Sequence, residues 1–316
     1  MKLLVEFLPW EISFLKRGKR DRDISSLLGS DTLFGALVNV AALCGLDNLK
    51  DSLLKGEIIF SSLFPVIKGN GENIYFLPLP NLSYKIDLTK RKRYKTIKYL
   101  SWKVWEEIDK YLNKDDLSVS ERFWKAYEDI DGTYSRKLTQ SLRSIDRIRV
   151  GIDVLQSGSV PYFENYIYIK DDVFVYFFAD CHKELLNDFK IALAVLAYEG
   201  LGGKRTIGSG LFKKSITREL EIEEKSDSYY VNLSLVVPTE GERKDSISYR
   251  LAKRGGGFIY RLCGTGKRKP FINTFAEGSI FKKPIRGQII PFGDFYFYGR
   301  SFNLSIGTKL KCKKEL

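Results

Sequence analysis

Alternation of apolar and polar positions predicts the first elements of the chain. Leu3, Val5 and Phe7 recur at every second position, which is the period of a half-buried strand. Ser30 or Asp31 can cap the helix that follows. The apolar residues of that helix fall on one face, namely Leu33, Phe34, Leu37, Val38 and Ala41.

The same periodicities extend to residue 217. Runs 58–66 and 74–79 flank the turn signal Lys-Gly-Asn-Gly-Glu and predict a hairpin. Two more strands, a helix with one apolar face and a final strand are predicted over 160–169, 173–178, 182–199 and 211–216. With the segment 84–131 counted as an insertion, these elements can be arranged as βαβ-βαβ, which is the ferredoxin-like plan.

The insertion at 84–131 has a different pattern. It contains the run Lys90-Arg91-Lys92-Arg93-Tyr94-Lys95 and then 97–111, where Trp102 and Trp105 stand at helical spacing. We predict an inserted basic arm followed by a helix. A run of charge is in most cases a solvated surface, but tyrosines beside it favour nucleic-acid contact, because bases stack on aromatic rings while cations track phosphates.

A short charged stretch without apolar periodicity, 219–228, is the best domain boundary. It separates a first domain, 1–220, from a second domain, 228–316. The second domain has no convincing amphipathic helix, and its strand-like runs are 229–237, 247–251, 272–275, 279–281, 288–291 and 302–306. We therefore predict an α+β protein of two domains, the second of which is mostly β.

The net charge of the chain indicates the kind of partner that it binds. The chain has 52 Lys and Arg against 39 Asp and Glu, a formal charge of +13, which favours a polyanionic partner: nucleic acid first, an anionic membrane surface second. The four cysteines are far apart and His182 is the only histidine, so we expect no metal site, cofactor or disulfide framework and a reducing cytoplasm. No window approaches 18 uncharged apolar residues, which argues against a membrane span.

The densest motif is the glycine-rich stretch from Gly200 to Phe212, where five glycines surround the adjacent cations Lys204 and Arg205. Glycine is needed where the backbone takes positive φ or where another backbone comes close, and cations in such a turn favour a phosphate chain. The stretch joins a helix to a strand, the reverse of a nucleotide-binding loop, and no GxxxxGK[ST] match occurs. The alternative is a helix C-cap at Gly200 followed by a mobile loop.

Two other stretches are strongly basic. One spans Arg136 to Arg149. The other is the middle of the second domain, which contains Arg250, Lys253, Arg254, Arg261, Lys267, Arg268 and Lys269. Charge alone makes four of these arginines candidates for RNA contact: Arg143, Arg147, Arg149 and Arg254.

The glycine-rich loop resembles that of the RAMP superfamily, the ferredoxin-like RNA-binding proteins of CRISPR systems. More narrowly, the chain resembles the fourth subunit of the Csm complex, the type III-A CRISPR effector. The segments that carry the resemblance occur in the same order along one chain. They are 30–37 (SDTLFGAL), 60–65 (FSSLFP), 76–80 (FLPLP), the basic run to 98–101 (KYLS), the glycine-rich loop, 275–281 (FAEGSIF) and 298–299 (YG).

The resemblance implies a non-catalytic subunit with two ferredoxin-like halves. Such a subunit holds the repeat-derived 5′ tag of the CRISPR RNA, docks the large polymerase-like subunit and contacts the adjacent backbone RAMP subunit, in antiviral defence. By position, the tag-holding role falls on Gly202, Gly203, Lys204, Arg205, Gly208 and Gly210. The basic arm would correspond to the protruding thumb of the family, with Lys92, Arg93 and Lys95 as its RNA contacts.

An enzymatic alternative within the superfamily is a repeat-processing endoribonuclease. Such cleavage works best with a group that titrates near neutrality, and His182, at a predicted helix start, is more typical of a surface or capping residue. In the processing enzymes the glycine-rich loop lies close to the C-terminus, whereas residues 213–316 follow it here. That position argues against the nuclease.

Two further alternatives remain open. Metal-dependent cleavage needs convergent carboxylates, and the spacing of Asp31, Asp146 and Asp153 forms no recognisable cluster. The equivalent subunit of the Cmr-type (III-B) complex would hold a tag in the same way but dock different neighbours. The segments 30–34 and 76–80 favour the Csm type.

Overall fold

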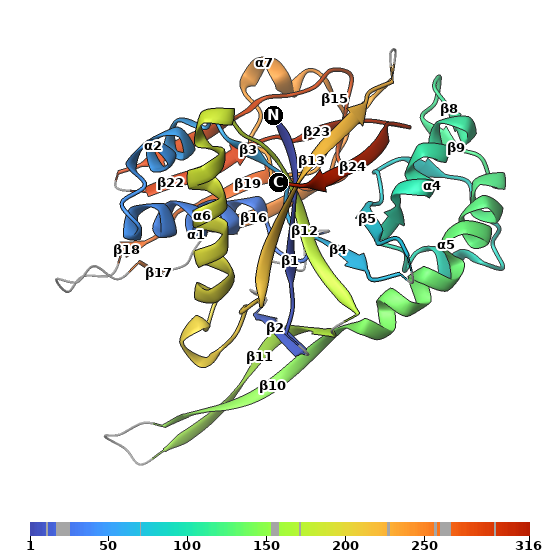
Figure 1. The fold of residues 1–316 in the computed structure, drawn as a ribbon. Helices are drawn as coiled ribbons and strands as arrows, with labels where there is room; N and C mark the ends of the chain where they lie inside the picture. The colour runs from blue at the N-terminus through green and yellow to red at the C-terminus, as the bar shows by residue number, and fades with distance from the viewer. Residues whose placement is uncertain are drawn as a thin grey trace.

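The computed structural model describes residues 1–10, 12–16, 26–69, 71–152, 158–170, 172–225, 228–255, 258–259, 267–293 and 295–316. Its centre is an eight-stranded sheet with the path β24-β13-β1-β12-β4-β5-β7, in which β3 also pairs with β12 (Figure 1). These strands are β1 (Lys2–Leu8), β3 (Ile59–Phe60), β4 (Phe64–Ile67), β5 (Ile74–Pro78), β7 (Tyr99–Ser101), β12 (Val173–Asp180), β13 (Lys214–Glu223) and β24 (Lys309–Glu315).

Two helices cover one face of this sheet. α1 (Ser30–Leu43) lies between β1 and β4 in the chain, and α6 (Leu186–Glu199) connects β12 to β13. The strands β13, β1, β12 and β4 are each antiparallel to their neighbours. Buried side chains from both helices and the sheet, such as Leu37, Leu193 and Phe177, form the core on this side. The short α2 (Asp47–Lys55) packs on α1.

Residues 84–131 pack over the other face of the sheet as a compact lobe, and they do not protrude as the predicted arm. The lobe contains α3 (Arg91–Tyr94), α4 (Trp102–Glu107), a 3-10 turn (Ile108–Tyr111), most of α5 (Arg122–Ser141), and the small strands β6 (Ser83–Tyr84), β8 (Leu112–Asn113) and β9 (Ser118–Val119). Aromatic packing explains the compactness, because the Tyr94 ring stacks on Trp124 at 4.3 Å and both are buried. The helix predicted over 97–111 begins later, since Tyr99–Ser101 pairs with β5.

The element that projects is instead a long hairpin made by β10 (Leu142–Ile152) and β11 (Ser159–Lys170), with β2 (Ile12–Lys16) paired to β11 (Figure 1). A strand was predicted from the sequence at 160–169, whereas 136–149 was described only as a basic stretch. The first part of that stretch continues α5, and the rest forms β10.

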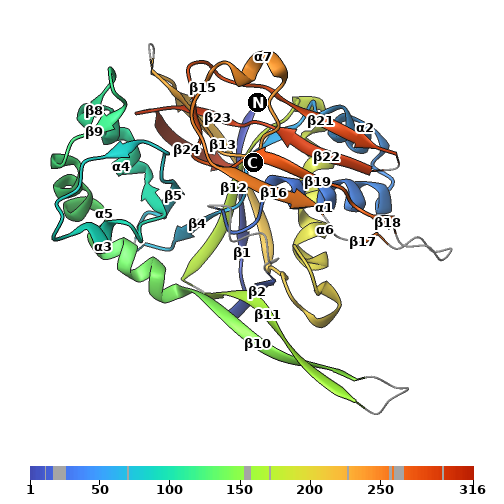
Figure 2. The ribbon, with the colours of Figure 1, turned by 180° about the vertical axis from the view of Figure 1, so that it is seen from behind.

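The second half of the chain is mostly strands, as predicted, with one short helix, α7 (Glu240–Arg243), among its described residues. Its strands are β14 (Tyr230–Asn232), β15 (Ser246–Ser248), β16 (Leu251–Gly255), β17 (Phe258–Ile259), β18 (Lys267–Arg268), β19 (Phe271–Phe275), β20 (Ile280–Phe281), β21 (Gly287–Phe292), β22 (Phe295–Arg300) and β23 (Asn303–Ser305). Seen from behind, β16, β19, β21 and β22 lie beside α1, while the lobe lies on the other side of the main sheet (Figure 2).

The two halves share one sheet and one core. β13 runs to Glu223, into the stretch predicted as the boundary, and the C-terminal strand β24 pairs with it. Tyr298 of β22 stacks on Phe60 with ring centroids 4.4 Å apart, and its hydroxyl accepts the backbone N–H of Phe60 at 2.9 Å. Burial raises the pKa of the Tyr298 phenol, so this contact stays uncharged. None of the described helices is long and apolar enough to cross a membrane.

Candidate nucleic-acid interface

The glycine-rich loop is closed by its own backbone. α6 ends at Gly200, whose φ of 87° lies in the left-handed region, and the Leu201 N–H donates to the Gly210 carbonyl at 2.9 Å. Gly210 has φ 77°, and a Cβ there would lie 1.9 Å from the Leu201 carbonyl oxygen. Only glycine fits at this crossing. Beyond it, Phe212 donates to the Ala197 carbonyl at 2.9 Å and anchors the loop on α6.

Lys204 occupies a strained position at the tip of the loop. Its φ of 65° is left-handed, a conformation that costs a residue with a Cβ about 1 to 2 kcal/mol. Arg205 follows in a short 3-10 turn, and the two side chains are 42% and 40% exposed. The loop therefore presents two accessible cations on a backbone that glycines bring into close turns.

A buried carboxylate joins this loop to the projecting hairpin. Glu164 of β11, with a side chain only 6% exposed, lies 3.6 Å from the Lys204 ammonium and 3.6 Å from Nε of Arg149. The Tyr166 hydroxyl donates to the same carboxylate at 2.8 Å, and the Arg147 guanidinium lies 5.2 Å from the centre of the Tyr166 ring. One carboxylate thus positions two cations from segments that are far apart in sequence.

The hairpin has two unlike faces. Pairing of Arg147 with Glu164 and of Arg149 with Tyr162 places these residues on one face, together with Arg143 and its partner Tyr168. The alternate positions form the other face, where several apolar side chains are exposed: Ile148, Val150, Ile152 and Phe163. The three arginines predicted from charge therefore share a basic and aromatic face with the Glu164 junction.

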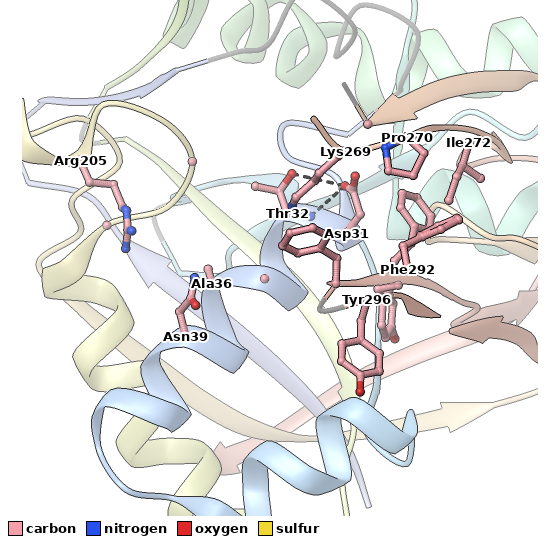
Figure 3. Close-up of a pocket in the computed structure, with 17 residues that line it drawn as sticks. Asp31, Thr32, Ala36, Asn39, Arg205, Lys269, Pro270, Ile272, Phe292 and Tyr296 are labelled. Carbon is pink, nitrogen blue, oxygen red and sulfur yellow. Dashed lines mark hydrogen bonds between the residues drawn. The ribbon is translucent and has the colours of Figure 1, made fainter. Parts of the chain in front are cut away.

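Next to the loop is a cavity of about 350 Å³ between the two halves of the chain (Figure 3). Gly200, Gly202 and Arg205 line it from the loop. The first turns of α1 contribute Asp31, Thr32, Gly35, Ala36 and Asn39, and the second half contributes Gly255, Lys269, Pro270, Ile272, Phe292, Phe295, Tyr296, Phe297 and Tyr298.

The lining combines cations with aromatic rings. Arg205 lies on one side of the cavity, Phe292 and Tyr296 lie on the other, and Lys269 lies near Pro270 and Asp31 (Figure 3). Rings of this kind stack on nucleobases, while guanidinium and ammonium groups bind phosphates. The sequence-based prediction missed this aromatic wall, although the run of aromatic residues from Phe292 to Tyr298 was a usable signal.

Arg254, the fourth arginine predicted from charge, is in a different environment. Its side chain is 8% exposed, and its Nε and Nη2 donate to the two carboxylate oxygens of Asp31 at 2.9 Å each. This bidentate ion pair ties β16 to the first turn of α1. The structure therefore gives Arg254 a partner inside the protein, at the wall of the cavity.

The lysines and arginine predicted on the arm also lie elsewhere. Lys92, Arg93 and Lys95 are on or next to α3, in the lobe on the face of the sheet opposite to α6 and the glycine loop. All three are exposed, and Arg93 pairs with Glu128 at 3.3 Å. The structure does not bring them to the loop.

Of the candidate catalytic groups that the structure describes, only Asp31 lies at the cavity. His182 is exposed before the first turn of α6, a helix of 14 residues that separates it from the loop by about 21 Å at 1.5 Å per residue. Burial raises the pKa of the neighbouring Cys181 thiol to about 11. Asp31 is paired with Arg254, Asp146 accepts the side-chain amide of Asn165, and Asp153 lies outside the described residues.

These features define a mixed α/β protein whose basic, aromatic-lined surface is of the kind that binds single-stranded nucleic acid. Residues 225–306 match the family model of the CRISPR Csm4 C-terminal domain. The chain is 30% identical over 293 residues to the "CRISPR system Cms protein Csm4" of Thermococcus onnurineus, covering 88% of this chain and 91% of that protein. The protein of the same name from Methanocaldococcus jannaschii is 28% identical over 312 residues, covering 84% and 81%. The chain belongs to the Csm4 family.

Solved structures share the fold. A chain from the crystal structure of a Csm3-Csm4 subcomplex in the type III-A CRISPR-Cas interference complex matches with a TM-score of 0.67 and 24% identity, over 96% of this chain and 99% of that one. A chain from a Csm1-Csm4 cassette in complex with cA4 matches with a TM-score of 0.57 and 21% identity, over 97% and 98%. The resemblance to the fourth Csm subunit is thus confirmed, and with it the mixed α/β fold.

Proposed function

We propose that this chain is a non-catalytic subunit of a type III-A CRISPR RNA-guided effector complex in the cytoplasm, where it supports antiviral defence. It holds the 5′ repeat-derived tag of the CRISPR RNA and docks the large polymerase-like subunit. Membership of the Csm4 family supports this role, as do the relatives solved in a Csm3-Csm4 subcomplex and a Csm1-Csm4 cassette.

The observation that carries the tag-binding part is the Glu164 junction. It brings Lys204 of the glycine-rich loop and Arg149 of the hairpin to one carboxylate, beside a cavity that has cations and aromatic rings in its lining. Phosphates bind the cations of the loop and hairpin, and unpaired bases stack on the rings of the cavity. Arg254 acts through Asp31 and holds the cavity wall.

The scaffold is a ferredoxin-like unit. The order β13-β1-β12-β4, with α1 and α6 on one face, is that of two interleaved βαβ crossovers. The glycine-rich loop follows the second helix of this unit and the hairpin precedes its third strand, β12, so both tag-binding segments are connections of one rigid sheet.

The hairpin β10–β11 takes the role of the thumb in place of the arm expected at 84–131. Its basic face is turned to the tag, and its exposed apolar face, formed around Ile148, Val150 and Phe163, contacts the adjacent backbone subunit. Exposed apolar side chains on a projecting strand pair are suited to burial against another protein.

The test is RNA binding with analysis of the RNA afterwards. The purified protein, alone and with its large-subunit partner, is titrated with RNAs that carry or lack the tag, over a salt series. Tag-dependent binding that Lys204→Ala/Arg205→Ala weakens and His182→Ala leaves unchanged supports the proposal. Metal-independent cleavage at one repeat position that disappears in His182→Ala would instead make the protein a processing ribonuclease.

A further inference from the structure

Two cavities adjoin along α5, away from the cavity beside the glycine loop. Each has a volume of about 290 Å³. Four residues line both of them, Thr96, Ile97, Ser135 and Thr139, so the two form one continuous groove. This α5 groove runs between the last three turns of the helix and the segment 93–99 of the lobe, and it ends at the base of the hairpin.

Three arginines line the α5 groove. Arg93 lies toward the lobe, Arg136 on the helix and Arg143 at the start of β10. Arg136 donates through Nε to the Gly132 carbonyl at 3.0 Å, and Arg143 donates through Nε to the Gln140 carbonyl at 3.1 Å. These acceptors carry no charge. Within the described part of the chain, neither guanidinium has a carboxylate partner, so both keep their charge for a ligand.

Small side chains keep the groove open between these cations. Gly132, Ser135 and Thr139 lie on one side of α5 and line it. A Cβ built on Gly132 would meet only Glu128 Cβ, at 4.0 Å, so space remains above the helix there. An extended chain with regularly spaced negative groups suits a groove flanked by arginines better than a compact ligand does.

At its hairpin end the groove meets the basic face of the hairpin at one residue, Arg143. Arg143 lines the groove and begins the basic face of β10, on which Ile145, Arg147 and Arg149 follow. The other hairpin residues that line the groove, Leu142, Ser144 and Ile167, lie on the opposite face. Arg149 shares Glu164 with Lys204 of the glycine loop. Arg143 is therefore the residue at which the groove and the basic face of the hairpin meet.

We propose that the α5 groove binds the sugar-phosphate backbone of the single-stranded nucleotides that adjoin the tag. This inference rests on the proposed function, because it extends the same RNA surface. Arg136 and Arg143 bind phosphates through the fork of donors that their backbone contacts leave available. The contacts are independent of sequence, since phosphates carry no base identity.

The test compares Arg136→Gln with Lys125→Gln, which removes an exposed cation on the same helix outside the groove. Three labelled RNAs are titrated by fluorescence anisotropy: the tag alone, and the tag with about ten further nucleotides at its 3′ or its 5′ end, a length typical of single-strand sites. We expect the groove variant to weaken one extended RNA about tenfold and the tag alone less than about twofold. Its salt slope on that RNA falls by about 0.7, the value for one phosphate contact.

Several results would overturn the groove proposal. Equal weakening of all three RNAs would place Arg136 in the tag site, and an equal effect of Lys125→Gln would mean that Arg136 acts only through general charge. Normal RNA binding together with lost co-purification of a partner subunit would make the groove a protein-docking site. The proposed function fails separately, if the wild type does not distinguish tagged from untagged RNA.

Discussion

Single residues fix the shape of the glycine-rich loop. Gly210 is required because any side chain would strike the Leu201 carbonyl, whereas Lys204 accepts a left-handed backbone although it carries a Cβ. Backbone strain held at one residue of a turn is commonly associated with a functional site. Here the strained residue is the cation that meets Glu164 beside the cavity.

This strain predicts that two substitutions at Lys204 differ in stability but not in their effect on RNA binding. Lys204→Gly relieves the left-handed backbone and Lys204→Ala does not, so we expect the glycine variant to have a free energy of unfolding about 1 kcal/mol higher than the alanine variant. Both remove the ammonium group and weaken RNA binding alike. Urea unfolding and RNA titration measure the two effects. Equal stability of the two variants would mean that the loop does not hold this conformation.

At the scale of helices and strands, a buried carboxylic acid joins helix α5 to strand β7. Asp131 of α5 accepts the Ser101 N–H of β7 at 2.8 Å through one oxygen, while its other oxygen has no hydrogen-bond partner among the described residues. Burial raises the pKa of this carboxyl, against the opposing effect of the Ser101 hydrogen bond. The ionised form therefore lowers the stability of the lobe.

The pH dependence of stability follows from that sign. Because the folded pKa of Asp131 lies above its unfolded value, the penalty is full at neutral pH and disappears as pH falls through the raised pKa toward the ordinary range. Asp131→Asn should therefore gain stability relative to wild type at pH 7, and the gain should shrink in acid. Asp131→Ala, which leaves the Ser101 N–H unpaired, should lose about 1 to 3 kcal/mol in acid, and less at pH 7, where the wild type carries the penalty of the ionised carboxyl. Thermal unfolding at pH 7 and near pH 4 measures these differences in stability. A difference between Asp131→Asn and wild type that is the same at both pH values would contradict the prediction.

Elements with an apolar face were predictable from sequence, and those without one were not. β1, α1, β12 and α6 each bury one periodic set of side chains, so their patterns are visible in the chain. β10 exposes most of both faces, alternating arginine with isoleucine and valine, and its pattern therefore suggests only charge. The lobe was misjudged for the opposite reason, because its aromatic residues pack on one another rather than on a protruding surface.

At the scale of the whole molecule, contacts between segments that are far apart in sequence determine which residues form the site. The glycine loop and its cations could be predicted because they are local in sequence. The ion pair joins Arg254 to Asp31 across 223 positions of sequence. The sequence alone reveals only the charge of Arg254, and that charge favoured RNA contact. The aromatic wall around Tyr296 likewise becomes part of a cavity only when the second half packs on α1.

The Asp31–Arg254 pair holds the two halves together and should be tested as a stability element. Arg254→Gln leaves a nearly buried carboxylate unpaired, and we expect it to lower the free energy of unfolding by about 3 kcal/mol. Adding Asp31→Asn should recover part of that loss, because no unpaired charge remains. Denaturant unfolding of the single and double variants gives the coupling. If the double variant regains stability but loses RNA binding as strongly as Lys204→Ala, then Arg254 contacts RNA directly.

The most direct test of the central claim is photo-crosslinking of the tag in the reconstituted complex. A CRISPR RNA with photoreactive nucleotides in its 5′ tag is bound, irradiated and mapped to peptides by mass spectrometry. We predict crosslinks to the glycine-rich loop at 200–210, to the basic face of the hairpin at 143–149 and to the aromatic wall at 292–298. Crosslinks confined to the lobe at 84–131, with none in these three segments, would contradict the account.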